Sequence, residues 1–389
     1  MSNPTNPNNN SLFAPAPKPA APTKSDQVKA ILGLALNFMQ KRLHKNGNVY
    51  LVDSTSRKVF FIDDESVFNT ITELALRNNV VISNSAIQTA KRILKSQSGT
   101  TPSKINLRIG LGQHAYFLDF ADGVNFIRYS ADGAEKVILN SQNAHSIDVD
   151  FLRAANLAPI PPLIRMGRPA HAAYPKPLNE EGTLNWLLRR SPCLNLLLSI
   201  TNIPERYYSI IISWMVCTLL PERAQTVLEI TGEESSGKST AAWIIKSLID
   251  PADKTLNETP SSTKELLSIA QNSHIVAIDN ADELSELMQG KIYELLTSGV
   301  QFQTNYGLPG NSWTITLRKP IIVTSTSSML SNKSLAKQSI SIDLPHLKEG
   351  KHAQIINEQF YENHPYPMCQ RSCRLMISED NHALLLAGT

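Results

Sequence analysis

Residues 231–240 read TGEESSGKST, and their types and spacing are suited to holding phosphate. From Gly232 onward they fit the pattern G-x-x-x-x-G-K-[ST] at every fixed position. Gly232 and Gly237 allow a turn that brings successive backbone N–H groups onto phosphate oxygens, and Ser235 and Ser236 add little bulk there. The stretch is therefore interpreted as a phosphate-binding loop.

The residues that close this loop add charge and a metal ligand. Lys238 would place its ammonium on the β- and γ-phosphates of ATP, and the hydroxyl of Ser239 can ligate Mg²⁺. An apolar run precedes the loop and an apolar-striped helix over 239–249 follows it, so the helix dipole lies behind the bound anion. The predicted nucleotide-binding residues are Gly232, Glu233, Glu234, Ser235, Ser236, Gly237, Lys238, Ser239 and Thr240.

A second element is predicted to hold the metal. In SHIVAIDNADEL (273–284), four apolar residues form a buried strand that ends at Asp279. Ligands of parallel α/β sheets bind at the carboxyl ends of the strands, which would place Asp279 beside Ser239 as a second Mg²⁺ ligand. A buried strand that merely ends in an Asp turn is the alternative.

A third apolar strand, KPIIVTSTSS (319–328), ends in hydroxyl groups. If it lies between the other two strands, Thr326 or Ser325 can face the γ-phosphate or the attacking water, and Thr326 is the predicted catalytic residue alongside Lys238 and Asp279. A strand ending in a polar turn is an equal alternative. Between the motifs, 254–260 is predicted as a strand and 262–272 as a helix, an insertion typical of ATPases.

The chain divides into six predicted segments. Apolar positions recur at helical spacing over 28–43, 66–79 and 85–96, with a strand pair at 49–64, whereas short alternating runs predict an antiparallel sheet after residue 104. The segments are a disordered Pro- and Asn-rich tail (1–25), a mostly helical region (26–100), a small β domain (101–165), a Pro-rich connector with helices (166–221), the ATPase core (222–345) and a C-terminal extension (346–389).

The composition is that of an ordinary globular protein, with 42% hydrophobic and 18% charged residues. No apolar stretch is long enough for a membrane helix, and the N-terminus lacks the pattern of a secretory leader, so a cytoplasmic location without membrane contact is expected. The net charge of +3 does not by itself indicate a nucleic-acid binder. Short basic runs at 41–45, 91–95 and 188–190 are interpreted as solvated helix faces.

The order of these motifs resembles the superfamily 3 helicases, which are hexameric ring ATPases of viruses and mobile elements. The chain is more closely similar to a group of phage- and mobile-element ATPases related to primase-helicases. The likeness lies in LIDP (248–251), AIDNADEL (277–284), LLTSGV (295–300), RIGLGQHAYFLDF (108–120) and APIPP (158–162). It implies an α/β fold with an AAA+/superfamily 3-like P-loop core and a parallel sheet, preceded by a small mixed helical and antiparallel β domain and the disordered tail.

The resemblance further implies an ATP- and Mg²⁺-dependent ATPase that forms a homo-oligomeric ring and acts on DNA, with single-stranded DNA as one candidate form. Three features depart from the family pattern. Thr326 stands where these helicases usually carry Asn. Lys337 and Gln338 stand where related proteins have an arginine that reaches into the neighbouring subunit's site. Asn280 follows Asp279 where many ATPases have the carboxylate that activates water.

The predicted hairpin at 300–317 also differs, because its tip (305–311) carries no basic residue. Glu258 or Glu283 could supply the base that activates water. Two alternatives to the ATPase therefore stay open: a nucleotide-gated assembly protein with little or no hydrolysis, and a small-molecule kinase. A kinase would need an arginine-bearing lid, and residues 346–389 contain only Arg371 and Arg374.

Overall fold

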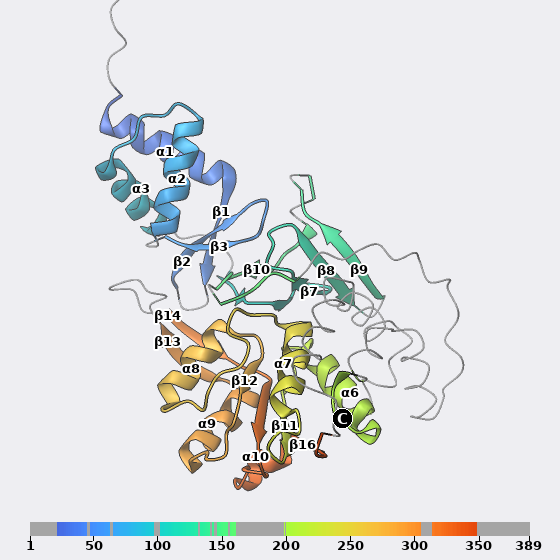
Figure 1. The fold of residues 1–389 in the computed structure, drawn as a ribbon. Coiled ribbons are helices and arrows are strands. Elements are labelled where there is room, and N and C mark those ends of the chain that lie inside the picture. Colours follow the sequence, from blue (N-terminus) through green and yellow to red (C-terminus); the bar gives the residue numbers. More distant parts are fainter. Residues whose placement is uncertain are drawn as a thin grey trace, which may run out of the picture.

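The computed structural model contains a parallel α/β core, a small antiparallel sheet and an N-terminal helical region (Figure 1). It describes residues 22–44, 47–62, 65–96, 102–130, 133–140, 142–143, 146–154, 156–160, 198, 200–304 and 313–347. The first part of the tail, most of the Pro-rich connector, the hairpin tip and nearly all of the C-terminal extension lie outside the described residues. Among the described helices, none has the length and apolar character needed to cross a membrane.

The N-terminal region combines three helices with a four-stranded sheet. The helices pack on the sheet through a cluster of apolar side chains that includes Ile31, Leu51 and Ile87. The elements are α1 (Lys24–Phe38), β1 (Met39–His44), β2 (Val49–Asp53), β3 (Val59–Phe61), α2 (Glu65–Arg77), α3 (Asn84–Ser96) and β4 (Pro102–Ser103), and the strand order is β3-β2-β1-β4. Helix α1 begins within the predicted tail, where Thr23 caps its first turn.

The predicted helix over 28–43 is wrong beyond Phe38. Residues 39–43 instead pair with β2 in an antiparallel ladder, and Met39 already has extended backbone angles. Pairing with a neighbouring strand has overridden the local helical spacing, as tertiary context commonly does. The basic run that begins at Lys41 therefore lies on a strand, and in the run on α3 the side chain of Lys91 is buried.

The predicted small antiparallel sheet is confirmed. Its strands follow one another as a meander in the order β6-β7-β8-β9, namely β6 (Ile109–Leu111), β7 (Tyr116–Asp119), β8 (Asn125–Ser130) and β9 (Gly133–Ile138). Beside it, β5 (Ile105–Asn106) pairs with β10 (Asp150–Phe151). Leu118 and Ile127 belong to the same buried cluster as the helices of the core, so the small sheet packs directly on it.

The core is a parallel sheet in the order β12-β15-β11-β16, so the third apolar strand lies between the other two, as predicted. Its strands are β11 (Val227–Gly232), β12 (Val276–Ile278), β15 (Ile321–Ser325) and β16 (Ser339–Leu344). The three neighbouring strands β12, β15 and β11 are buried along their whole length. Burial along the whole strand is expected when helices cover both faces of a sheet.

Helices cover both faces of this sheet (Figure 1). On one face lie α6 (Tyr208–Thr218) and α7 (Lys238–Ile249). On the other lie α8 (Thr263–Asn272), α9 (Glu286–Leu296) and α10 (Lys333–Lys337), together with the hairpin β13 (Val300–Thr304) and β14 (Trp313–Leu317). The fold class predicted from the sequence, an α/β P-loop core preceded by smaller elements, is confirmed.

The strand predicted at 254–260 does not form. Only Asn257 adds to the sheet edge: its backbone N–H donates to the carbonyl of Ala277 (2.9 Å), and its own carbonyl accepts from the N–H of Asp279 (2.7 Å). The segment lacks the apolar alternation that would bury one face, and Pro260 ends any further pairing. This isolated contact nevertheless fixes the backbone at the point where Asp279 leaves the sheet.

Candidate nucleotide site

The phosphate loop connects β11 to α7, and its two fixed glycines are required by geometry. Gly232 has φ of 147°, and a Cβ there would lie 2.6 Å from the carbonyl oxygen of Leu344 and 2.7 Å from Oγ of Ser236. Gly237 has φ of 87° and forms the left-handed N-cap of α7. A side chain at either position would strain the backbone, so the loop keeps a concave surface of backbone groups.

Lys238 stands at the first position of α7 and folds back across the loop. Its Nζ donates to the carbonyl oxygens of Gly232 and Glu233, both at 2.7 Å, and its side chain is buried. The neighbouring Oγ of Ser236 is buried and has no hydrogen-bond partner among the described residues. A buried hydroxyl without a partner, an ammonium group and a helix N-terminus therefore meet in one place, and together they fit a phosphate group.

Asp279 lies just beyond the end of β12 and is oriented by a residue of the adjacent strand. The hydroxyl of Thr324 donates to Oδ1 of Asp279 (2.5 Å) and accepts from the backbone N–H of Asn280 (3.0 Å). Carboxylates that ligate metals are commonly held by such a second hydrogen bond. Thr324 was not among the predicted site residues, although a hydroxyl residue near the end of an otherwise apolar strand was the signal that could have found it.

Thr326, at the end of β15, contacts an acidic residue that the sequence analysis did not assign. Its backbone N–H and its hydroxyl both donate to Oδ1 of Asp282, at 2.7 and 2.8 Å. These bonds lower the pKa of Asp282, and the charge of Lys238 lowers it further. Asp282 is thus ionised and near the phosphate loop, and its second oxygen has no protein partner in the part of the chain that the structure describes.

The two carboxylates named from the sequence as possible bases are placed differently. Glu258 and Glu283 are exposed, as Asp282 is, but neither makes a hydrogen bond or ion pair with a described residue. Asp282, by contrast, is fixed by two donors from the strand that lies between β12 and β11. It is therefore the better candidate for a carboxylate that acts at this site.

A buried carboxylate in β11, Glu229, holds the loop that follows Thr326. Glu229 is fully buried, and it accepts hydrogen bonds from the hydroxyl of Ser328 (3.0 Å), the N–H of Met329 (3.1 Å) and the hydroxyl of Ser341. These donors come from the loop after β15 and from β16. Glu229 thereby ties the loop that follows Thr326 to the central strand, and we assign it a structural role.

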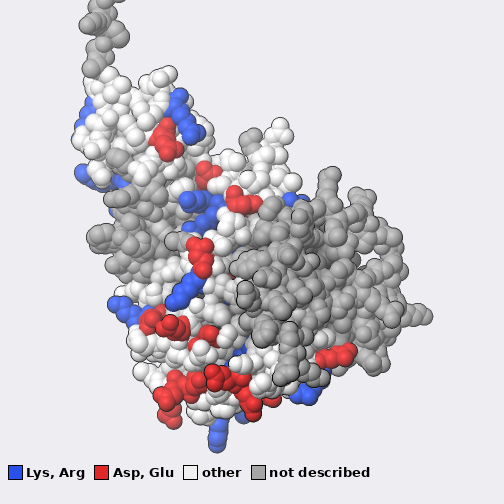
Figure 2. All heavy atoms as spheres, in the orientation of Figure 1, with Lys and Arg blue, Asp and Glu red and all other residues white. Residues whose placement is uncertain are grey.

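Charge on the described surface is mixed (Figure 2). Asp and Glu gather at the lower end of the core, around α9 and α10, and Lys and Arg are interspersed with acids above them. This face carries no continuous basic stripe over the described residues, in keeping with the small net charge. A nucleic-acid contact would therefore have to be local.

Residues 194–366 match the family model described as the actinomycete integrative conjugative element replication protein. The matched segment contains the phosphate loop, Asp279, Asp282 and Thr326. This result confirms the predicted relation to proteins of bacterial mobile elements. No curated protein matches the sequence significantly.

Solved helicase structures are also similar to the chain. They include the SCCmec type IV Cch active helicase (12% identity, TM-score 0.46, covering 89% of this chain), the apo C-terminal region of NrS-1 (12%, 0.41, 92%) and the JCV helicase (14%, 0.29, 54%). The chain spans 62% of the length of the Cch helicase, 74% of the NrS-1 region and 61% of the JCV helicase. These TM-scores are low, so the fold assignment rests on the sheet order and the phosphate loop.

Proposed function

We propose that the chain binds ATP with Mg²⁺ and hydrolyses it while acting on DNA during replication of a mobile element. One observation carries the ATPase part. Three neighbouring parallel strands, β11, β15 and β12, end at one edge of the sheet, and their ends bring together the phosphate loop, Thr326 with Asp282, and Asp279 with Thr324. Ligands of open α/β sheets bind at this edge.

Each residue has a distinct part in the proposed site. Lys238 would replace its hydrogen bonds to the carbonyls of Gly232 and Glu233 with bonds to the β- and γ-phosphates. The hydroxyl of Ser236, which has no partner among the described residues, would then hydrogen-bond to a phosphate oxygen. Ser239 and Asp279 would hold Mg²⁺, which when bound neutralises charge that develops on the phosphates. Magnesium bound with a nucleotide commonly takes one or two protein ligands, with phosphates and water as the rest.

Asp282 supplies the carboxylate that Asn280 does not. Hydrolysis needs a group that orients the attacking water and accepts its proton, and a positioned carboxylate can do both. Thr326 holds one oxygen of Asp282 and leaves the other without a protein partner. Thr326 would therefore act through Asp282, linking the γ-phosphate side of the site to the end of β15.

The DNA part of the proposal rests on the family match and on the hairpin β13–β14 that follows α9. The replication-protein family indicates a process on DNA, and a helicase-like or DNA-remodelling activity of a homo-oligomeric ring suits an ATPase core of this kind. The hairpin tip (305–311) lies outside the described residues.

Turnover of labelled ATP, measured with and without single-stranded DNA, tests the proposal. We expect Mg²⁺-dependent hydrolysis that DNA stimulates, and its loss in Lys238→Ala. Lys264→Ala is the matched control, because Lys264 is an exposed lysine on α8 without an ion pair among the described residues. ATP binding without turnover on any DNA would refute the ATPase and favour the nucleotide-gated assembly protein. Phosphate transferred to a small acceptor would favour the kinase.

A further inference from the structure

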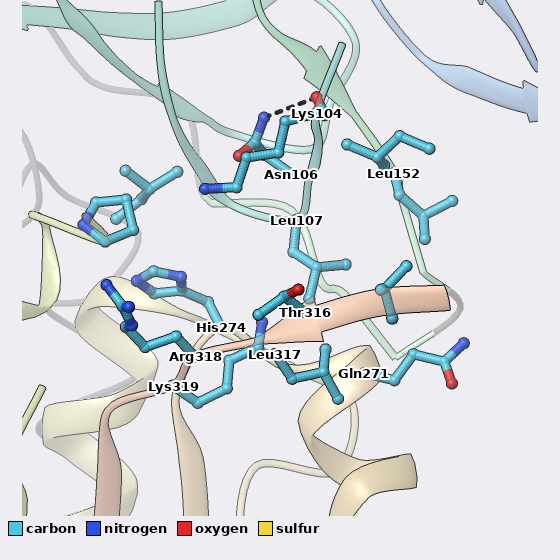
Figure 3. A pocket seen from close by; sticks show the side chains of 14 residues that line it. Lys104, Asn106, Leu107, Leu152, Gln271, His274, Thr316, Leu317, Arg318 and Lys319 are labelled. Atoms are coloured by element: carbon cyan, nitrogen blue, oxygen red, sulfur yellow. Dashed lines mark hydrogen bonds between the residues drawn. The ribbon is translucent and has the colours of Figure 1, made fainter. Parts of the chain in front are cut away.

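A second cationic site lies at the base of the hairpin, away from the phosphate loop. It is a cavity of ≈ 100 Å³ between the segment around β5 and the end of β14. Figure 3 shows Lys104, Asn106 and Leu107 on its upper wall and Arg318 and Lys319 rising from below. The cavity is several times larger than the space that one water needs, and none of its 14 lining residues is acidic.

Lys319 forms the buried cationic floor of this cavity. Only 8% of the residue is exposed, and its Nζ, which keeps access to the cavity, has no hydrogen bond or ion pair with any described residue. Burial lowers the pKa of Lys319 to about 8, and the charges of Lys246 and Lys104 add to this effect while Asp250 opposes it. Burying a charge without a partner costs free energy. An anion bound beside Lys319 would remove that cost.

The nearby carboxylate cannot supply this charge because other groups already use it. Asp250 is fully buried, and its Oδ2 accepts from Nζ of Lys246 (2.8 Å) and from the N–H groups of His274 and Ile275 (both 2.9 Å). Its Oδ1 lies 3.4 Å from Nε of Arg108, which is also fully buried. One carboxylate thus neutralises two cations, and the charge of Lys319 is left over.

A second unpartnered donor lies beside Lys319. Arg318 uses one terminal nitrogen, Nη1, to donate to the carbonyl of Glu222 (3.0 Å), but its Nε is buried and has no hydrogen-bond partner in the described structure. At the mouth, Lys104 pairs with the carboxylate of Glu222 (2.7 Å) and remains half exposed. The cavity therefore offers the ammonium of Lys319, and the guanidinium of Arg318, whose Nε is enclosed without a partner, adds positive charge beside it. Cations of this kind suit a phosphate oxyanion.

We propose that this cavity binds a backbone phosphate of a single nucleic-acid strand, held by Lys319 and Arg318. The rest of the lining favours a nucleotide unit over a bare anion, because the apolar side chains of Leu107, Leu152 and Ile315 also line the cavity. Such side chains can receive a sugar or a base. The inference rests on the proposed action on DNA, and it places a DNA contact at the hairpin base.

The decisive variants are Lys319→Met and Arg318→Gln, with Lys264→Met as the control for loss of a lysine. They are made in a Lys238→Ala background, so that phosphate bound at the loop does not contribute. We expect the Kd for a thymidine oligonucleotide to rise about tenfold in Lys319→Met, and the slope of log K against log salt to fall by about 0.7, the value for one phosphate on a single strand. The control should match its parent.

Thermal unfolding provides an independent readout. Without added anion, Lys319→Met should unfold at a higher temperature than its parent, because it removes an uncompensated buried charge. Added inorganic phosphate should stabilise the parent but not Lys319→Met. Unchanged oligonucleotide affinity and salt slope in both variants would overturn the proposal, and stabilisation by phosphate without any effect on DNA binding would reassign the site to free phosphate.

The same variants distinguish failure of the cavity proposal from failure of the proposed ATPase activity. Lys319 lies outside the nucleotide site, so Lys319→Met in an otherwise unaltered chain should keep its turnover without DNA. If that turnover persists and DNA affinity is also unchanged, only the cavity proposal fails. If no variant turns over ATP but Lys319→Met still weakens oligonucleotide binding, the ATPase fails and the cavity remains a DNA contact.

Discussion

The phosphate loop and the cavity at the hairpin base offer positive charge in different ways. In the loop, the ammonium of Lys238 rests on two backbone carbonyls, and a partial positive charge comes from the N-terminus of α7. In the cavity, the ammonium of Lys319 has no described partner, and the charge comes from side chains of distant segments. A loop of this kind is stable before its ligand arrives, whereas the cavity carries an electrostatic cost that a ligand would relieve.

The largest effect is expected on the cavity side, where Asp250 neutralises buried cations. Asp250→Asn keeps the shape but leaves Lys246 and Arg108 without a counter-charge, so we expect a loss of about 3–5 kcal/mol in the free energy of unfolding. Urea denaturation measures it. Glu294→Gln is the control, because its pair with Lys291 lies at the surface and should contribute less than about 1 kcal/mol. A small loss in Asp250→Asn would mean that the cluster tolerates uncompensated charge.

Asp282→Asn tests the loop side by removing a charge and little volume. Because Asp282 is the proposed base, we expect kcat for ATP hydrolysis to fall by about 10²-fold. The affinity for ATP should change little, since the hydrogen bonds from Thr326 can be kept by the amide oxygen. Glu283→Gln, one residue further along, is exposed and should leave kcat unchanged. A normal kcat in Asp282→Asn would mean that another group activates the attacking water.

Gly232→Ala tests whether the loop depends on its backbone shape. The new Cβ would meet the carbonyl of Leu344 at 2.6 Å, and φ of 147° is strained for alanine. A penalty of about 1–3 kcal/mol in the bound geometry would weaken ATP affinity by about 10- to 100-fold. Gly290→Ala is the matched control: it lies inside α9 with open space around its Cβ, so it should stabilise the fold slightly and leave affinity unchanged. If the two variants bound ATP equally well, ATP binding would not depend on the backbone conformation at Gly232.

The same contrast explains what the sequence could predict. The phosphate loop and the apolar strands follow from local patterns, because each is encoded within about ten consecutive residues. The place of β15 between β12 and β11 depends instead on pairing between segments far apart in sequence. Asp282 and Thr324 escaped because their significance depends on which strands are neighbours. The cavity escaped entirely: Lys104, Asp250 and Lys319 are far apart in sequence, and a buried lysine looks the same as an exposed one until the fold places it.

The smallest predicted effect concerns His274, which lies on the cavity side between Asp250 and the carbonyl of Thr218. Burial lowers the pKa of His274 to about 4, although Asp250 opposes the shift, and its ring nitrogen Nε2 lies 2.8 Å from that carbonyl. The folded protein thus keeps a neutral ring while the unfolded chain takes up a proton below its ordinary pKa near 6.5. Stability is fully present above that pH and is lost as the pH falls toward 4.

Between pH 6.5 and 5 this proton uptake should cost about 1.5 kcal/mol of unfolding free energy. His274→Gln has no ring to protonate, so the slope of stability against pH in this window should be flatter than in the parent, whatever its absolute stability. Asp250 does not contribute there: burial alone would raise its pKa, but Lys246 and Arg108 outweigh burial and hold it well below the window. Urea denaturation across the window measures both slopes. Equal slopes would mean that His274 takes up a proton in the folded protein. The charged ring would then add to the positive charge already present around Lys319.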